Sequence, residues 1–165
     1  MSAPNDSDTW RTGYHQVLLK EVAHHFAKED RGLIFSGLFA GLVPNQGPPS
    51  LLLITRPQRD IDYPLWNEAR EVWAQNQPSL EQFVSELQQA GFAKIEHSIE
   101  AYLCSVALDQ WQAMIKARFW STFANFTDTE LEEACDMIAT NERHRIEDEN
   151  IRAQDRLLLI TATEV

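Results

Sequence analysis

The 165-residue sequence contains only two cysteines and six glycines, and it has no long apolar run. A helix that spans a bilayer needs about 20 consecutive apolar residues, and the first residues carry no basic stretch followed by an apolar one, so neither a membrane span nor an export signal is predicted. Cys104 and Cys135 stand apart without CxxC spacing. This spacing argues against a disulfide framework and against a zinc knuckle, and we expect two buried thiols.

Basic residues are also scarce, with 14 Lys and Arg against 25 Asp and Glu and a formal charge of -11. Such a surface repels nucleic acid and anionic membranes, so neither is expected as a partner. The length fits one domain with a sizeable core. We expect a cytoplasmic protein with a poorly ordered stretch at 1–13, followed by a single folded unit over 14–165.

Strand-like and helix-like patterns alternate along the chain, which predicts an α/β fold. The strands are expected at 17–22, 51–55, 95–108 and 157–163, the third with a bend or bulge, and helices at 28–43, 65–74 and from the Ser79/Gln82 capping box to Gly91. The five letters "LLLIT" occur twice, at 51–55 and 157–161. Both runs are predicted to be central strands, and 51–55 has the composition of a strand buried on both faces.

An insertion of helical character, residues 109–150, precedes the last strand. Its first helix is expected to begin at Asp109 and to run to 118, and its second to begin at the Thr127/Glu130 capping box and run to 139. The stretch "KARFWSTFANF" between them is rich in aromatic residues. At helical spacing Phe119 and Phe123 share a face and are expected to pack in the core, whereas Trp120, together with Arg118, is a candidate for a binding pocket or for further packing.

The stretch "LLKEVAHHF", residues 18–26, combines the end of a predicted strand with charged and imidazole groups. Its ExxHH order matches neither HExxH nor HxxEH, so no metal site is predicted. Open α/β sheets bind ligands at the carboxyl ends of central strands, which favours a functional role for Lys20, Glu21, His24 and His25. The equally compatible alternative is that the histidines start the next helix and hydrogen-bond neighbouring loops.

Several motifs together resemble the C-terminal half of a class I S-adenosylmethionine-dependent methyltransferase, with a Rossmann-like fold. They are "VLLKEVAHHF", the Pro/Gly turn "VPNQGPPS", "LLLITRP" and "LQQAGF". In that family the fourth strand often ends in two histidines, a Pro/Gly turn precedes the fifth strand, and an "AGF" step precedes the sixth. The resemblance implies a partial sheet of about four strands with flanking helices, in which the last strand is reversed and lies between those at 51–55 and 95–108.

The resemblance also implies roles for individual residues. The main chain near Lys20 and Glu21 would line the cleft for S-adenosylmethionine, and His24 or His25 would face a small-molecule methyl acceptor as the catalytic residue. Arg118 and Trp120 would bind that acceptor. Methyl transfer depends more on positioning than on acid-base chemistry, so a cleft histidine could act only by orienting the acceptor.

The sequence departs from the family because nothing upstream supplies a Gly-rich turn or an acidic residue for the cofactor ribose. The chain alone is therefore expected to bind S-adenosylmethionine weakly or not at all. Three classes stay open: a truncated or split methyltransferase, a non-catalytic α/β binding or interaction module derived from one, and an unrelated α/β enzyme that uses the histidines. In the first two, the exposed strand at 17–22 could pair with another chain.

Overall fold

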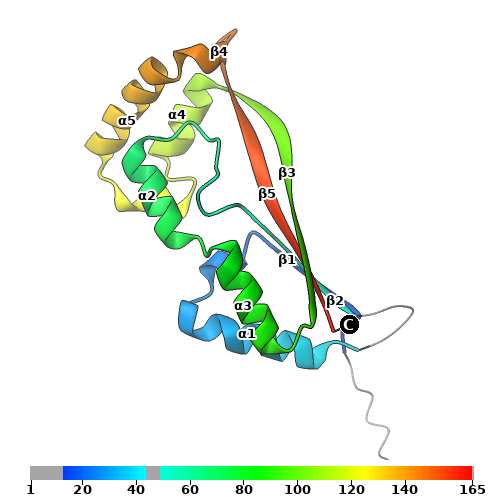
Figure 1. Cartoon of the computed structure of the whole chain (residues 1–165). Helices are drawn as coiled ribbons and strands as arrows, with labels where there is room; N and C mark the ends of the chain where they lie inside the picture. Colours follow the sequence, from blue (N-terminus) through cyan, green and yellow to red (C-terminus); the bar gives the residue numbers. More distant parts are fainter. Residues whose placement is uncertain (1–12, 44–48, 165) are drawn as a thin grey trace, which may run out of the picture.

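The computed structural model describes residues 13–43 and 49–164, and it consists of one mixed sheet with helices. Figure 1 shows the arrangement. The elements are β1 (Gln16–Lys20), η1 (Ala23–His25), α1 (Lys28–Gly41), β2 (Ser50–Thr55), α2 (Asn67–Asn76), α3 (Leu80–Ala90), β3 (Lys94–Ala107), α4 (Leu108–Lys116), η2 (Ser121–Asn125), α5 (Asp128–Asn141), η3 (Arg143–Arg145), β4 (Ile146–Glu147) and β5 (Asn150–Thr163).

The sheet has the strand order β1-β2-β5-β3, and the short β4 pairs with the start of β5. β1 and β2 are parallel, whereas β5 runs antiparallel to both of its long neighbours, β2 and β3. The predicted α/β class, the helical insertion and the reversed last strand between its two predicted neighbours are therefore confirmed.

Two helices begin where their capping boxes predict. The Ser79 hydroxyl accepts a hydrogen bond from the Gln82 amide at 3.2 Å, and the Thr127 hydroxyl accepts one from Glu130 at 3.3 Å. Gly91 ends α3 with a φ of 113°, in the region that favours glycine.

Helices α1 and α3 cover one face of the sheet. Their buried residues and those of the strands form one core, which includes Phe35, Leu51, Leu53, Phe83, Leu87, Phe92, Leu158 and Ile160. The strand residues between these, such as Leu18, Leu52 and Leu159, point to the opposite face and stay partly or largely exposed. Among the described residues, no helix covers that opposite face.

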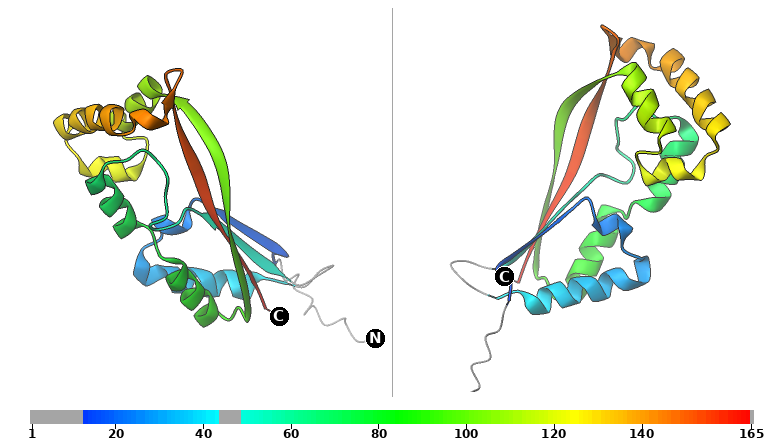
Figure 2. Two further views of the ribbon diagram at one scale, coloured as in Figure 1. Left: turned by 45° about the horizontal axis from the view of Figure 1, so that its top comes forward. Right: turned by 180° about the vertical axis from the view of Figure 1, so that it is seen from behind.

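Beyond β2, the strands β3 and β5 continue as a two-stranded ribbon that turns over. In the part of β5 next to α1 and α3, the buried residues include Leu158 and Ile160. At the other end of β5 the buried residues are Ile151 and Ala153, whose side chains are on the opposite face of the strand. The pairing with β3 is unbroken over all 14 residues, so twist alone brings the second face round. Figures 1 and 2 show α1 and α3 at one end of these strands and the other helices at the other end, all on the same side.

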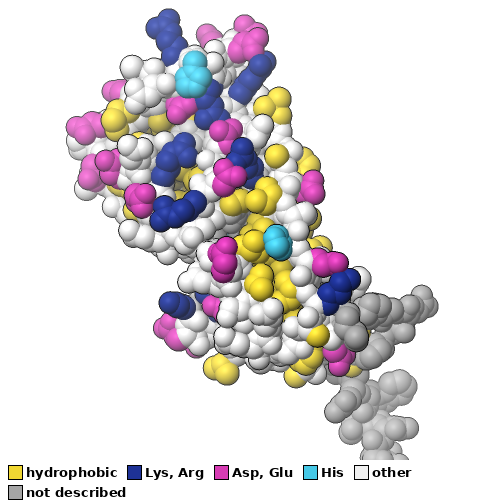
Figure 3. Space-filling view, viewed as in Figure 1, with side chains coloured by type: hydrophobic (Ala, Val, Ile, Leu, Met, Phe, Trp, Pro, Cys, Tyr) yellow, Lys and Arg dark blue, Asp and Glu magenta, His cyan; other side chains and the backbone are white. Residues whose placement is uncertain are grey.

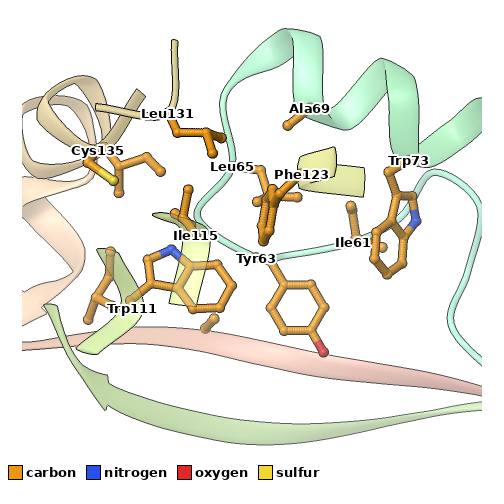
Figure 4. Packing of buried hydrophobic residues seen from close by; sticks show 13 residues of the cluster. Ile61, Tyr63, Leu65, Ala69, Trp73, Trp111, Ile115, Phe123, Leu131 and Cys135 are labelled. Atoms are coloured by element: carbon orange, nitrogen blue, oxygen red, sulfur yellow. The ribbon is translucent and has the colours of Figure 1, made fainter. Parts of the chain in front are cut away.

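We call the helical group at the far end of the ribbon the cap; it comprises α2, α4, η2, α5 and the segment 56–66. Its core is separate from that of the sheet. It is rich in aromatic residues, as Figure 4 shows. Its largest buried members are Tyr63, Trp73, Trp111 and Phe123. The stacking of Trp66 on Phe123, with ring centroids 5.9 Å apart, adds a partly buried ring to this core.

Several expectations about element ends were wrong. β1 ends at Lys20 and not at 22, because Glu21 takes a φ of 54°, which no strand residue adopts. β5 begins seven residues earlier than the "LLLIT" run, and β3 carries no bulge. Asp109 is not the start of α4: the helix begins at Leu108, and the Asp109 carboxylate accepts a hydrogen bond only from the next amide, Gln110, at 2.6 Å.

Three burial expectations also need correction. Cys104 is exposed although it is paired with the buried Ala153, because β3 is the edge strand of the sheet, while Cys135 is buried as expected. β2 is buried on one face only, since nothing described covers the other. Phe119 is 63% exposed and does not pack beside Phe123. The reason is that α4 stops at Lys116, so the two rings do not share a helical face. The expectation for 1–13 lies outside the described residues except at Gly13.

Candidate functional site

The candidate site lies where the parallel strands β1 and β2 end side by side. The amide of Glu21, directly after β1, donates a hydrogen bond to the Ile54 carbonyl oxygen at 2.8 Å. Arg56 follows β2 in the same way and lies opposite Glu21, with which it forms an ion pair. The left-handed backbone at Glu21 sends the chain away from the sheet into η1, which carries His24 and His25.

Arg56 is the centre of a cluster that joins the sheet to the cap. Its Nε and Nη2 donate to the two carboxylate oxygens of Asp155 on β5, at 3.1 and 3.2 Å, and its Nε also contacts the Tyr63 hydroxyl at 2.8 Å. Tyr63 in turn donates to Asp155. The guanidinium carbon lies 5.7 Å from the Tyr63 ring centroid and 5.9 Å from that of Trp120.

The electrostatics of this cluster keep its donors protonated. Burial, followed by the hydrogen bond to Asp155, raises the pKa of Tyr63. Burial alone would lower the pKa of Arg56, but the hydrogen bonds and charges of Tyr63 and Asp155 outweigh it, so the pKa of Arg56 is raised. Tyr63 is therefore a hydrogen-bond donor at neutral pH and is not a general base.

The segment 56–66 is held in place by donors from the cap helices. Arg70 donates to the carbonyl oxygens of Ile61, Tyr63 and Leu65, at 3.1, 2.7 and 3.1 Å. The Trp73 and Trp111 indole nitrogens donate to the carbonyl oxygens of Pro57 and Pro64, both at 3.1 Å. These bonds satisfy backbone carbonyl oxygens of a segment that has no secondary structure of its own. They therefore hold the segment in one conformation, with Tyr63 beside Arg56.

Two cavities meet at Arg56, Phe119 and Trp120. The first, about 370 Å³, opens at the carboxyl ends of β1 and β2 and is called the strand-end cavity. It is lined by Glu21, His24, His25, Arg56, Trp73, Asn76, Gln77, Phe119, Trp120, Ser121 and Thr122. The second, about 230 Å³, is called the ribbon cavity and lies between the cap and the turned-over part of β3 and β5. It is lined by Arg56, Tyr63, Pro64, Cys104, Val106, Trp111, Met114, Phe119, Trp120, Ile151, Ala153 and Asp155.

Of the residues that the sequence singles out, four come together at the strand-end cavity: Glu21, His24, His25 and Trp120. The two imidazole rings lie 4.0 Å apart between centroids. Burial, and then the charge of His25, lowers the pKa of His24 to about 4. His24 is therefore neutral at pH 7. Both histidines lie in the separate turn η1 and do not begin α1.

The other two predicted residues lie elsewhere. Lys20 is exposed on β1 and does not line the strand-end cavity. Arg118 lies two residues after the end of α4, in a left-handed conformation with a φ of 53°. Its Nη2 donates to the Phe126 carbonyl oxygen and to the Asp128 carboxylate, at 2.9 and 2.7 Å. It lines a different surface hollow. The structure therefore places Arg118 after the end of α4, away from Trp120's cavities.

Sequence reasoning missed the three residues at the centre of the site: Arg56, Tyr63 and Asp155. Arg56 carried a usable signal, because it directly follows a predicted central strand in "LLLITRP". Asp155 lies between the predicted insertion, which ends at 150, and the predicted last strand, which begins at 157; no strand was predicted there although Ile151 and Ala153 alternate with polar residues as in a strand. Tyr63 carried no signal in its surroundings.

Neither a metal-ligand group nor a membrane-spanning helix occurs among the described residues. No group of three or more His, Cys, Asp or Glu side chains is arranged to hold a metal ion in that part of the chain. Across the same residues, no helix has the length and apolar character needed to cross a membrane.

Comparison with solved structures identifies the fold. A presumed methyltransferase from Bacillus halodurans aligns with 93% of this chain and 70% of its own, with 16% identity and a TM-score of 0.50. A presumed methyltransferase of an antibiotic biosynthesis pathway from Anabaena variabilis aligns over 92% and 67%, with 15% identity and a TM-score of 0.52. No family model matches the sequence, and no curated protein matches it.

A third structure, phosphoethanolamine N-methyltransferase 2 from Haemonchus contortus with S-adenosyl-L-methionine, aligns over 92% of this chain but 33% of its own, with 15% identity and a TM-score of 0.43. The first two show that the chain has a methyltransferase-like Rossmann fold, and at their level of identity they show the fold alone.

Proposed function

We propose that this chain is the acceptor-binding half of an S-adenosylmethionine-dependent methyltransferase that acts on a small molecule. One observation carries the proposal: β5 is reversed between β2 and β3, as the resemblance implies, and the strand-end cavity opens at the carboxyl ends of the parallel pair beside it. Ligands of open α/β sheets bind at such strand ends. The likeness of the fold to two presumed methyltransferases supports the same reading.

In this proposal the main chain at Lys20 and Glu21 forms one wall of the cofactor cleft, and His24 or His25 faces the acceptor with Trp120. The described residues do not fit a complete cofactor site. Of their glycines, three lie within α1, one ends α3, and Gly13 precedes β1, so none forms a turn from a strand into a helix. The proposal therefore assigns the other wall to a longer product of the gene or to a partner chain.

Isothermal titration calorimetry tests the half-site reading. We expect S-adenosylmethionine and S-adenosylhomocysteine to bind this chain alone weakly or not at all, because the most directional contacts to such cofactors come from a Gly-rich turn and a ribose carboxylate. A dissociation constant in the micromolar range would overturn the reading, since this chain alone would then suffice.

The histidines are tested in a protein with a complete cleft. Replacing His25 with Ala should lower the single-turnover rate of methyl transfer far more than it lowers the melting temperature, and the same comparison applies to His24. His15 lies away from the strand-end cavity, so His15→Ala is the matched control. Unchanged turnover per folded molecule in both variants would remove the histidines from the site.

A second candidate function is a non-catalytic interaction module, and the uncovered surface of the sheet favours it. β1 pairs only with β2 among the described strands, and Leu18 on it is 58% exposed. In this reading β1 pairs with a strand of another α/β chain. Analytical ultracentrifugation with Leu18→Lys tests the contact. A partner chain that binds the wild-type protein and restores cofactor binding would support the methyltransferase proposal. A partner chain that binds without restoring cofactor binding would support the interaction module.

A further inference from the structure

Glu21 is the only carboxylate among the lining residues of the strand-end cavity, and Arg56 is the only guanidinium. Arg56 is shared with a second carboxylate, that of Asp155 in the neighbouring ribbon cavity, so one positive charge serves two negative ones. The remaining polar lining residues, apart from the histidines, are the uncharged Asn76, Gln77, Ser121 and Thr122. His24 is neutral at pH 7, because burial and the neighbouring His25 lower its pKa to about 4, so it does not repel a cation.

Unused hydrogen-bond acceptors line the same cavity. Three side-chain atoms of its lining residues are buried without a hydrogen-bond partner: Glu21 Oε1, Gln77 Oε1 and His24 Nδ1. Gln77 is only 6% exposed. Two of the three atoms can only accept hydrogen bonds, and buried polar atoms are rarely left without a partner. A ligand that supplies N-H donors would satisfy them.

Aromatic rings surround these acceptors. Trp73, Phe119 and Trp120 all line the strand-end cavity, and indole faces attract cations. Trp120 already contacts one cation, since the Arg56 guanidinium lies 5.9 Å from its ring centroid. Carboxylate, free acceptors and aromatic rings together favour a positively charged nitrogen group.

The ribbon cavity next to it is suited to an apolar group. Beyond the cluster of Arg56, Tyr63 and Asp155, its lining consists of Pro64, Cys104, Val106, Trp111, Met114, Phe119, Trp120, Ile151 and Ala153. Its volume of about 230 Å³ exceeds the roughly 150 Å³ of an engineered cavity that binds benzene. Arg56, Phe119 and Trp120 line both cavities, so the two cavities adjoin.

We infer that the methyl acceptor is a basic amine that carries an apolar group, with its nitrogen in the strand-end cavity beside Glu21 and its apolar group in the ribbon cavity. This inference rests on the proposed function for the identity of the ligand as an acceptor. It also makes a statement about binding that does not need the cofactor: this chain discriminates small molecules by the charge of one end and by the apolar area of the other.

The test uses calorimetry on the wild-type chain with four probes: 2-phenylethylamine, 2-phenylethanol, phenylacetate and ethylamine. We expect the aromatic amine to bind about tenfold more tightly than the alcohol or the acid, as expected for one desolvated cation-aromatic contact. Ethylamine should also bind at least tenfold more weakly, since it leaves the ribbon cavity empty. Equal or tighter binding of phenylacetate, or no binding of the aromatic amine, would overturn the inference.

Two variants locate each end of the ligand. Glu21→Gln should abolish the preference for the amine over the alcohol, and Glu100→Gln, an exposed carboxylate on β3, is its control. Ala153→Leu should fill the ribbon cavity and remove the advantage of the phenyl group. Its control is Ser105→Leu, because Ser105 lies on the opposite face of the ribbon, next to the position paired with Ala153.

A second measurement, the rate of cysteine alkylation, does not rely on calorimetry. Cys104 lines the ribbon cavity and is exposed, whereas Cys135 is buried. Bound 2-phenylethylamine should slow alkylation of Cys104 and leave Cys135 unchanged, and unslowed alkylation at a saturating concentration would count against the ribbon cavity. These results are independent of cofactor binding: micromolar affinity for S-adenosylmethionine would overturn the half-site reading and leave the amine preference standing.

Discussion

Asp155→Asn tests whether the Arg56 cluster fastens the cap to the sheet. The substitution keeps the shape of the side chain and removes its charge. In the native chain the carboxylate accepts from Arg56 Nε and Nη2 at 3.1 and 3.2 Å, and the side chains of Arg56 and Asp155 are only 19% and 22% exposed. The substitution therefore removes one charge from an ion pair that is largely shielded from water.

The size of the effect follows from the burial and from the remaining partner. Removing one member of a buried ion pair costs about 3–5 kcal/mol. Because this pair keeps some exposure and Glu21 still pairs with Arg56, we expect a loss of about 2 kcal/mol in the free energy of unfolding. For a chain of this size that corresponds to a fall of roughly 4–8 °C in melting temperature.

Scanning calorimetry measures this fall, and Glu71→Gln is the matched control. Glu71 pairs with Arg59 at 3.9 Å, with both side chains more than half exposed, so its loss should cost no more than about 0.5 kcal/mol. If Asp155→Asn melted at the same temperature as Glu71→Gln, the cluster would contribute no more than a surface pair, and the reasoning would be refuted.

Three further predictions concern stability and are checked by urea unfolding. Gly91→Ala should cost about 1–3 kcal/mol, because Gly91 has a φ of 113° and an added Cβ would lie 2.7 Å from the Phe39 ring. Gly37→Ala is the matched control: a Cβ added to Gly37 meets no atom within 4 Å, so this variant should be more stable by about 0.5–1 kcal/mol. Ile115→Ala should cost about 2–5 kcal/mol, because Ile115 is fully buried in the cap, and a loss near zero would mean that the cap core is not packed as described. The pKa of His24 is lowered from 6.5 to about 4 in the folded chain, so the unfolded chain binds more protons between these pH values. The free energy of unfolding should therefore fall by about 1 kcal/mol as the pH drops from 6.5 to 4, after allowance for the partial exposure of the ring. His24→Gln should flatten this pH dependence, and an unchanged slope would contradict the prediction.

The parts of the fold that the sequence predicts well are those with a local signal. The capping boxes at Ser79 and Thr127 and the left-handed turn at Gly91 depend on neighbouring residues, and all three occur where predicted. The reversed last strand came from the resemblance, because no local pattern states which strands will pair. The early start of β5 was missed, although Ile151 and Ala153 flank Arg152 in strand-like alternation, because these two residues serve the cap core and not the sheet core.

The candidate site was only half predictable for a related reason. Glu21 and the two histidines follow one strand in a single stretch of sequence, so a pattern can mark them. The Arg56 cluster unites residues that lie 7 and 99 positions from Arg56, Tyr63 and Asp155. Its assembly depends on the ribbon turning over, and no spacing in the sequence encodes that twist.

The two separate cores have a consequence for how the molecule opens. The buried residues of the cap and those of the sheet form distinct clusters, so each is a candidate cooperative unit in the native-state sense. Amide hydrogens of α4 and α5 should then exchange with solvent in events that leave β2 and α3 protected. Arg56, which joins the two units, lines both cavities, so we expect the openings that admit deuterium to the cap to admit and release a ligand as well.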